Sequence, residues 1–168
     1  MEYTRGVDFE DYVIDVLKEL GLGIIVIPKM LYSKELRKKT QIDVVFINKK
    51  RIYCIEVKSA RMLKGSIESG KWLTSTSANR AGIKPIISPY RQNMMHILAL
   101  KLKFYRKGLK IPKIENIIVV RDNARITTDC KNVYRLSNLK NRILDDLYYT
   151  SDDGEDIDVE KVAQVIRS

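Results

Sequence analysis

Two acidic residues and a lysine lie within apolar stretches of this sequence, where the burial of charge is costly. In the segment TQIDVVFINKKRIYCIEVKS (residues 40–59), Asp43 precedes the apolar run VVFI, and Glu56 and Lys58 lie in the run IYCIEVK. Alternate side chains of a strand share one face, so Glu56 and Lys58 point the same way. An acid and a base become neighbours on that face.

The spacing of the two acids predicts that they face each other. If the two runs pair as a hairpin closed symmetrically about Lys49 and Lys50, facing residues have numbers that add to 99, and Asp43 lies opposite Glu56. Their Cβ atoms are then roughly 5 Å apart. Two facing like charges destabilise a sheet unless a positive charge lies between them. A divalent cation would supply that charge.

Carboxylate ligands with room for water suit Mg²⁺ or Mn²⁺, and the sequence has no Cys/His cluster that would indicate zinc. Such a cation beside a lysine serves displacement at phosphorus. The metal neutralises the phosphate and lowers the pKa of a bound water, while the ammonium orients that water or stabilises the developing charge. Phosphodiester hydrolysis therefore fits Asp43, Glu56 and Lys58. The structural alternative is that both acids end strands and pair with lysines across the sheet.

Most of the chain is strongly basic. The formal net charge is +10 over 168 residues, but residues 145–168 contain eight acids and two bases, so residues 1–144, with 29 bases and 13 acids, carry +16. Basic runs at 34–39 and 101–110 fit a surface that attracts phosphate backbones. The alternative is a solvated, lysine-rich surface without a nucleic-acid partner.

The order of the expected elements is that of a mixed α/β protein. Apolar positions at helical spacing predict a helix over residues 8–20, and residues 60–87, rich in Gly, Ser and Thr, predict a long excursion with a small hairpin about residues 69–70. The other expected elements are strands at 24–27, 41–47, 51–58, 116–121 and 132–136, and helices from Ser88 to about 107, over 138–148 and from about 158.

Length and composition predict one self-sufficient domain, with 45% hydrophobic residues to build its core. Cys54 and Cys130 make a weak case for a disulfide, and the N-terminus has no apolar signal core. No apolar run approaches the roughly 18 residues that span a bilayer. We therefore expect a soluble, cytoplasmic protein with no membrane partner.

Several sequence blocks, in this order, resemble the nuclease-related domain (NERD), a family of the PD-(D/E)XK nuclease superfamily. The blocks are GVDFEDYV (6–13), QID (41–43), IEVKS (55–59), a tryptophan after a Gly-rich excursion (Trp72) and SPYRQNMMHILALK (88–101). The resemblance covers about residues 6–105, with a looser match in NIIVVR (116–121). It departs from the family where Ser88 replaces the usual asparagine before Pro89, and serine caps a helix about as well.

This resemblance implies a restriction-endonuclease-like core, an α/β mixed sheet of order α-β-β-β-α-β, followed here by extra C-terminal strands and helices. It implies Asp43 and Glu56 as ligands of Mg²⁺, for which Mn²⁺ could substitute, and Lys58 as the catalytic lysine. Glu10 and the backbone carbonyl of Val57 complete the predicted ligand set. We expect residues 1–148 to form the nuclease-like domain, with an acidic spacer and a C-terminal helix over 149–168 packed on it.

Accessory residues each have a functional and a structural interpretation. Glu10, at the edge of the apolar helix face, either turns toward the site as a further catalytic carboxylate or stays solvated. Gln92 lies in the first turns of its helix, which favour anions, and is predicted to contact a phosphate or a metal-bound water. His96, one turn further on the same face, contacts substrate or packs in the core. Trp72 is expected to anchor its loop, and Gln41 to orient the site.

The predicted function is a Mg²⁺-dependent nuclease that hydrolyses phosphodiester bonds, with DNA favoured over RNA. Archaeal Holliday-junction resolvases resemble the chain in the same spacing, with Ser33 in the place of a loop serine, and act as dimers; a junction-resolving homodimer is the first alternative. A nucleic-acid-binding module whose nuclease fold no longer cuts is the second. The intact Asp43, Glu56 and Lys58 argue against the latter.

Overall fold

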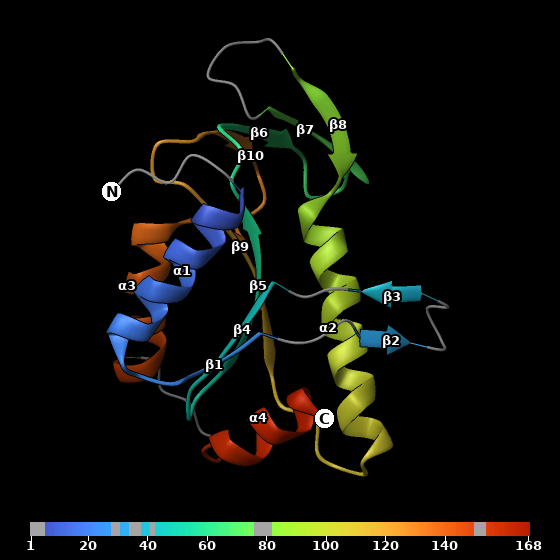
Figure 1. The fold of residues 1–168 in the computed structure, drawn as a ribbon, viewed down its shortest axis with the longest axis vertical. Coiled ribbons are helices and arrows are strands. Elements are labelled where there is room, and N and C mark those ends of the chain that lie inside the picture. Colours follow the sequence, from blue (N-terminus) through green and yellow to red (C-terminus); the bar gives the residue numbers. More distant parts are fainter. Residues whose placement is uncertain (1–5, 28–30, 34–37, 41–42, 76–81, 150–153) are drawn as a thin grey trace.

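The computed structural model of the chain describes residues 6–27, 31–33, 38–40, 43–75, 82–149 and 154–168. Its centre is a five-stranded mixed sheet, and a four-stranded sheet extends from one end of it (Figure 1). The central sheet has the order β1-β4-β5-β9-β11, formed by β1 (Ile24–Val26), β4 (Val44–Ile47), β5 (Ile52–Lys58), β9 (Ile114–Val120) and β11 (Val133–Arg135).

The direction of the strands changes at the middle of the central sheet. β1 pairs antiparallel with β4 and β4 with β5, whereas β5 pairs parallel with β9 and β9 with β11. A parallel pair needs a crossover connection, and between β5 and β9 the long helix α2 (Pro89–Arg106) supplies it. This crossover places α2 against the face of β5 on which the predicted site lies.

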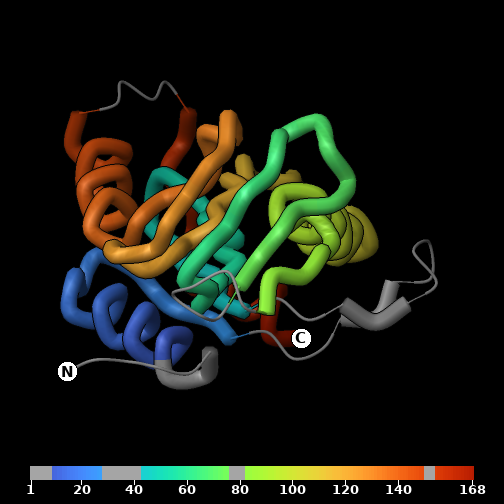
Figure 2. Tube along the Cα trace, turned by 90° about the horizontal axis from the view of Figure 1, so that it is seen from above, coloured from blue at the N-terminus to red at the C-terminus, as the bar shows by residue number. Residues whose placement is uncertain are grey.

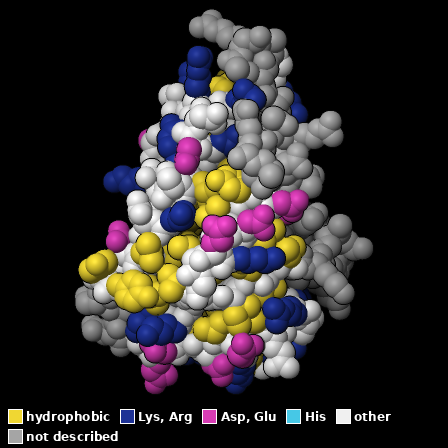
Figure 3. Space-filling view, turned by 60° about the vertical axis from the view of Figure 1, so that its left-hand side comes forward, with side chains coloured by type: hydrophobic (Ala, Val, Ile, Leu, Met, Phe, Trp, Pro, Cys, Tyr) yellow, Lys and Arg dark blue, Asp and Glu magenta, His cyan; other side chains and the backbone are white. Residues whose placement is uncertain are grey.

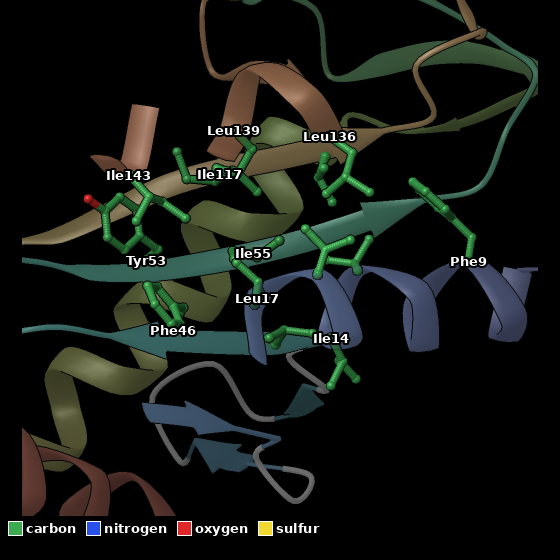
Figure 4. Packing of buried hydrophobic residues seen from close by; sticks show 14 residues of the cluster. Phe9, Ile14, Leu17, Phe46, Tyr53, Ile55, Ile117, Leu136, Leu139 and Ile143 are labelled. Atoms are coloured by element: carbon green, nitrogen blue, oxygen red, sulfur yellow. The ribbon is translucent and has the colours of Figure 1, made fainter. Parts of the chain in front are cut away.

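Helices cover both faces of the central sheet. α1 (Gly6–Leu20) and α3 (Leu136–Tyr148) lie on one face, and α2 and α4 (Val159–Arg167) on the other (Figures 1 and 2). The strands are buried on both sides, so alternate side chains enter two separate cores. Tyr53 and Ile55 of β5 pack with α1 and α3 (Figure 4), and Cys54 packs on the α2 side.

The C-terminal helix α4 packs on the central core through Val162, Ala163 and Ile166. Its last turn is further held by Lys103 of α2, whose Nζ donates to the carbonyl of Ile166 at 2.8 Å. The division of the chain between residues 148 and 149 stays a prediction.

The excursion after β5 forms most of the second sheet. Its order is β10-β6-β7-β8, formed by β6 (Met62–Gly65), β7 (Lys71–Ser75), β8 (Lys84–Ile87) and β10 (Arg125–Thr128). Leu63 and Trp72 of its inner face pack with Ile118 and Val120 of β9. A separate hairpin of β2 (Leu31–Ser33) and β3 (Lys38–Thr40) contacts α2.

The expected fold class is confirmed. The elements α1, β1, β4, β5, α2 and β9 follow the order α-β-β-β-α-β, and β10, β11, α3 and α4 are the extra C-terminal elements. The hairpin predicted near residues 69–70 is the β6–β7 hairpin. Cys54 and Cys130 are free thiols. Among the described residues, no helix combines the length and apolarity needed to cross a membrane.

Candidate active site

The hairpin of β4 and β5 sets the position of the two acids. Oδ1 of Asn48 accepts hydrogen bonds from the backbone N–H groups of Lys50 and Arg51, both at 2.9 Å, and closes a tight turn. Val44 then pairs with Ile55, so facing residue numbers add to 99 and the predicted register is confirmed. Continuing this register by one residue places Asp43 opposite Glu56.

Asp43 is fixed by the strand that it faces. Its Oδ2 accepts a hydrogen bond of 2.8 Å from the backbone N–H of Val57, the residue directly after Glu56. A carboxylate oriented by a main-chain donor loses little further freedom when it binds a cation, because its rotamer is already chosen. The other carboxylate oxygen of Asp43, Oδ1, takes no part in this hydrogen bond.

Glu56 and Lys58 share the face of β5 that α2 covers. Nζ of Lys58 lies 3.1 Å from Oε1 of Glu56, and Nδ1 of His96 on α2 lies 3.5 Å from Oε2 of the same carboxylate. Glu56 is only 4% exposed, whereas the Lys58 side chain is 24% exposed. The lysine therefore sits between the buried acid and solvent, where it can meet a substrate.

The buried carboxylate of Glu56 is strained electrostatically. Burial raises its pKa to about 7, the charge of Asp43 pushes the pKa in the same direction, and the ammonium of Lys58 opposes both. Its Oε2 is a buried oxygen without a hydrogen-bond partner among the described residues. A buried acceptor without a partner is costly, which is the condition that a bound cation relieves.

Asp43 and Glu10 extend this acidic region. Burial raises the pKa of Asp43, against the hydrogen bond from Val57 and the charge of Lys58. Burial also raises the pKa of Glu10 on α1, and the charge of Asp43 adds to the effect. The field of Glu10 reaches Glu56 as well. Asp43 thus lies close enough to raise the pKa of both other predicted acids, and Glu10 close enough to raise that of Glu56.

The described residues contain no group of three or more His, Cys, Asp or Glu side chains arranged around one point as metal ligands. Asp43 and Glu56 face each other across the hairpin. Glu10 is close enough to raise the pKa of Glu56 by its charge. Two carboxylates supplemented by a main-chain carbonyl and water remain a normal environment for Mg²⁺, which keeps several waters. The oxygen-only set does not suit zinc.

Comparison with known proteins bears directly on this site. The family model described as "Nuclease-related domain" (NERD) matches residues 5–121, which is more than half of the chain. The chain belongs to the NERD family. No curated protein and no solved structure matches it. Its function is thus nuclease-related, and the family implies a nucleic-acid substrate.

The NERD match includes the whole of the candidate site. It runs from before α1 to the residue after β9, so it covers Glu10, Asp43, Glu56, Lys58 and Gln92. It ends before β10, β11, α3 and α4. The edge strand β10 that completes the second sheet therefore lies beyond the matched segment.

The start of α2 carries the next predicted residue of this NERD site. Oγ of Ser88 accepts the backbone N–H of Arg91 at 3.2 Å, and Pro89 occupies the first turn, so Ser88 caps the helix as predicted. Gln92 is half-buried in that turn, and its backbone N–H donates to the carbonyl of Ser88 at 2.9 Å. Its role as a phosphate or metal-water contact stays a prediction.

Asn93 is a residue that sequence reasoning missed. It is completely buried, and its Nδ2 lies 2.8 Å from the carbonyl oxygen of Cys54 and 2.7 Å from Oδ1 of Asn116. Its Oδ1 lies 3.3 Å from Nδ1 of His96. Asn93 therefore joins α2 to β5 and β9 and touches the histidine beside Glu56. The signal for it was an asparagine three residues before the histidine, on one helix face.

The structure places two further predicted positions, Trp72 and Ser33. Trp72 is buried over Gly65, and its Nε1 donates to the carbonyl of Ser66 at 2.9 Å, so it anchors the β6–β7 hairpin as expected. Ser33 ends β2, and its side chain is not among those described. Gln41 lies outside the described residues.

Proposed function

We propose that this NERD protein is a Mg²⁺-dependent nuclease that hydrolyses phosphodiester bonds, with DNA favoured over RNA as substrate. The observation that carries the proposal is the buried Glu56 carboxylate, which faces Asp43, touches Lys58 and has a pKa raised to about 7. Such a cluster costs stability in the unliganded fold, which is typical of residues kept for function.

The residues fit a hard divalent ion. Asp43, Glu56 and the main-chain carbonyl of Val57 would hold Mg²⁺, with Glu10 as a further carboxylate, and Mn²⁺ would substitute. Oε2 of Glu56, which has no hydrogen-bond partner among the described residues, and the raised pKa values of all three acids support this assignment. When bound, the ion would neutralise the phosphate and lower the pKa of a water.

The chain's own residues orient the reaction. Lys58 has its ammonium held 3.1 Å from Glu56 while its side chain remains partly exposed, so it can approach a phosphate oxygen or the attacking water. There it orients the water or stabilises the charge that develops on the phosphate. Gln92, half-buried in the first turn of α2, is proposed to position the phosphate, because the positive end of the helix dipole favours anions there.

The proposal is tested with a panel of labelled substrates: linear and circular duplex DNA, single-stranded DNA, four-way junctions and RNA. Each is incubated with Mg²⁺, Mn²⁺ or EDTA. We expect cleavage of DNA that requires the metal and is lost in Glu56→Gln. The matched control is Glu19→Gln, an exposed acid on α1, which should cut at the parental rate.

The same panel separates the alternatives. Cutting confined to four-way junctions by a dimer would establish the resolvase alternative. Tight binding to nucleic acid without cutting under any metal would establish a silent binding module. Equal cleavage by Glu56→Gln and the parent protein would refute the assignment of the site.

A further inference from the structure

The second sheet has a solvent-exposed outer face of distinctive composition. In its register, Thr127 of β10 lies beside Lys64 of β6, Lys64 beside Leu73 of β7, and Leu73 beside Pro85 of β8, so these four side chains share one face. All four residues are exposed. This row crosses the full width of the sheet.

The exposed strand residues of this face carry three positive charges. They are Lys64, Lys71, Leu73, Pro85, Ile87, Arg125 and Thr127. Within the described parts of the four strands, neither face includes an aspartate or glutamate. In Figure 3, the charged side chains at the end of the molecule formed by this sheet are mainly basic, whereas acids and bases are interspersed further down.

Both ends of the excursion join elements of the candidate active site. β5 ends at Lys58 and β6 begins at Met62, so these residues are at most about 14 Å apart along an extended chain. β8 ends at Ile87, directly before Ser88, the cap of α2. The chain therefore enters the second sheet from β5 and leaves it into α2, the two elements that carry Glu56, Lys58 and Gln92, so the sheet lies next to the site (Figures 1 and 2).

Contacts beyond the chain connection hold the sheet in place. Nη2 of Arg91 on α2 donates to the carbonyl of Glu68 in the β6–β7 turn at 2.6 Å, and the N–H of Ser88 donates to the carbonyl of Gly70 at 2.9 Å. Leu63 and Trp72 are buried against β9. The outer face thus has a fixed orientation relative to Lys58 and Glu56.

We propose that this outer face, centred on Lys64, Lys71 and Arg125, binds the phosphate backbone of a DNA duplex whose scissile strand lies at Asp43 and Glu56. The inference rests on the proposed nuclease function. Duplex DNA carries one charge per about 1.7 Å of its axis, so a duplex held at the site continues over the adjacent surface, where positive charge binds it.

The side chains of this face favour a duplex over a single strand. Single strands are held largely by stacking of their bases on aromatic side chains. The described strand residues of the outer face include no aromatic side chain, because Trp72 turns inward and is buried. Lysine and arginine reach phosphates from a flat sheet, and Leu73 and Ile87 can lie against sugars.

The test compares two triple variants of equal charge change. Lys64→Gln/Lys71→Gln/Arg125→Gln removes the charges of the outer face. The control, Lys101→Gln/Lys107→Gln/Lys110→Gln, removes three exposed charges from the distal part of α2 and the loop after it. This helix has 18 residues and is about 27 Å long, so its far end lies well away from the second sheet. Thermal melts verify that both variants fold.

Binding to a 30-base-pair duplex is measured in EDTA over a series of salt concentrations. For the outer-face variant we expect the slope of log K against log salt to become shallower by about 2.7, because each lost phosphate contact removes about 0.9. We also expect the Kd at low salt to rise about tenfold or more. The control should change both quantities much less.

The outcomes distinguish this inference from the proposed function. If the parent protein cuts duplex DNA and the two triple variants bind it alike, the outer face is not the binding surface and the nuclease proposal stands. If the parent neither binds nor cuts any nucleic acid, both proposals fail. If only single-stranded DNA or RNA binding is weakened, the assignment to a duplex is overturned.

Discussion

Nδ1 of His96 lies 3.5 Å from Oε2 of Glu56, and both side chains are almost completely buried. The contact joins the middle of α2 to the carboxylate that is central to the candidate site. Asn93, one helical turn earlier, has its Oδ1 3.3 Å from the same Nδ1 atom. Helix α2 therefore supplies a positioning pair for Glu56 in addition to its core packing.

We expect His96→Ala to lower metal affinity and kcat by about tenfold or more, because residues that orient a ligand carboxylate typically contribute 10- to 100-fold. KM for DNA should change little, since the His96 side chain is almost completely buried. His96→Gln, which can restore a polar contact to Glu56, should recover part of the loss. Mn²⁺ titration and steady-state kinetics measure the two effects. A drop in thermal stability with unchanged metal affinity would indicate a packing role only.

Replacing Lys58, the proposed catalytic lysine, is expected to separate chemistry from binding. Lys58→Met keeps the length of the side chain but removes the ammonium 3.1 Å from Glu56, so kcat should fall at least about 100-fold. Duplex binding in EDTA should stay within a few-fold of the parent protein. Lys49→Met, which changes an exposed lysine of the β4–β5 turn, is the control. Full activity of Lys58→Met would remove Lys58 from the mechanism.

The raised pKa of Glu56 predicts how stability depends on pH. The pKa of this carboxyl is about 7 in the folded chain, against an ordinary value of 4.5, so between these pH values the folded state holds more protons than the unfolded state. The free energy of unfolding therefore falls as pH rises through this range. Glu56 alone contributes a loss of about 3 kcal/mol. Asp43 and Glu10, whose pKa values are also raised, act in the same direction.

Urea unfolding in EDTA at pH 5 and pH 8 measures this loss. Glu56→Gln should flatten the profile and be more stable than the parent protein at pH 8, and Mg²⁺ should restore stability to the parent but hardly to the variant. A parent protein whose stability is the same at both pH values would contradict the burial of an ionised Glu56.

The register of the site was predictable because it depends on local features. Two apolar runs separated by a short polar turn allow one symmetric closure about Lys49 and Lys50, and the pairing of Val44 with Ile55 confirms it. Strand alternation then assigns Glu56 and Lys58 to one face. The cap of α2 at Ser88 was predictable for the same reason, since it depends on adjacent residues.

Features that depend on distant parts of the chain were not predicted. Strand β10 is held by parallel pairing with β6, whose residues are more than 60 positions away, and RITT is a run of only four residues without a turn signature that would pair it locally. Asn93 bonds to groups on β5 and β9, at Cys54 and Asn116, so its role exists only after the helix has docked. Neither contact leaves a periodic pattern in the sequence.

Gly65 offers a test of the second sheet that does not involve charge. A Cβ atom at this position would overlap the indole ring of Trp72, which is 1% exposed and donates from Nε1 to the carbonyl of Ser66. We expect Gly65→Ala to destabilise the protein by about 1–3 kcal/mol, the usual cost of overpacking, which lowers Tm by several degrees in a chain of this size. The ring and its hairpin must shift to admit the methyl group.

The matched control is Gly70→Ala in the same hairpin. Its added Cβ would approach only the end of the exposed, flexible Arg91 guanidinium, at 2.9 Å, so a shift of that group would loosen at most one exposed hydrogen bond, from Nη2 to the carbonyl of Glu68. Gly70→Ala should therefore leave Tm nearly unchanged, whereas Gly65→Ala should lower both Tm and duplex affinity, because Lys64 and Lys71 flank the displaced hairpin. Equal melting temperatures for the two variants would show that Trp72 does not fill the space over Gly65.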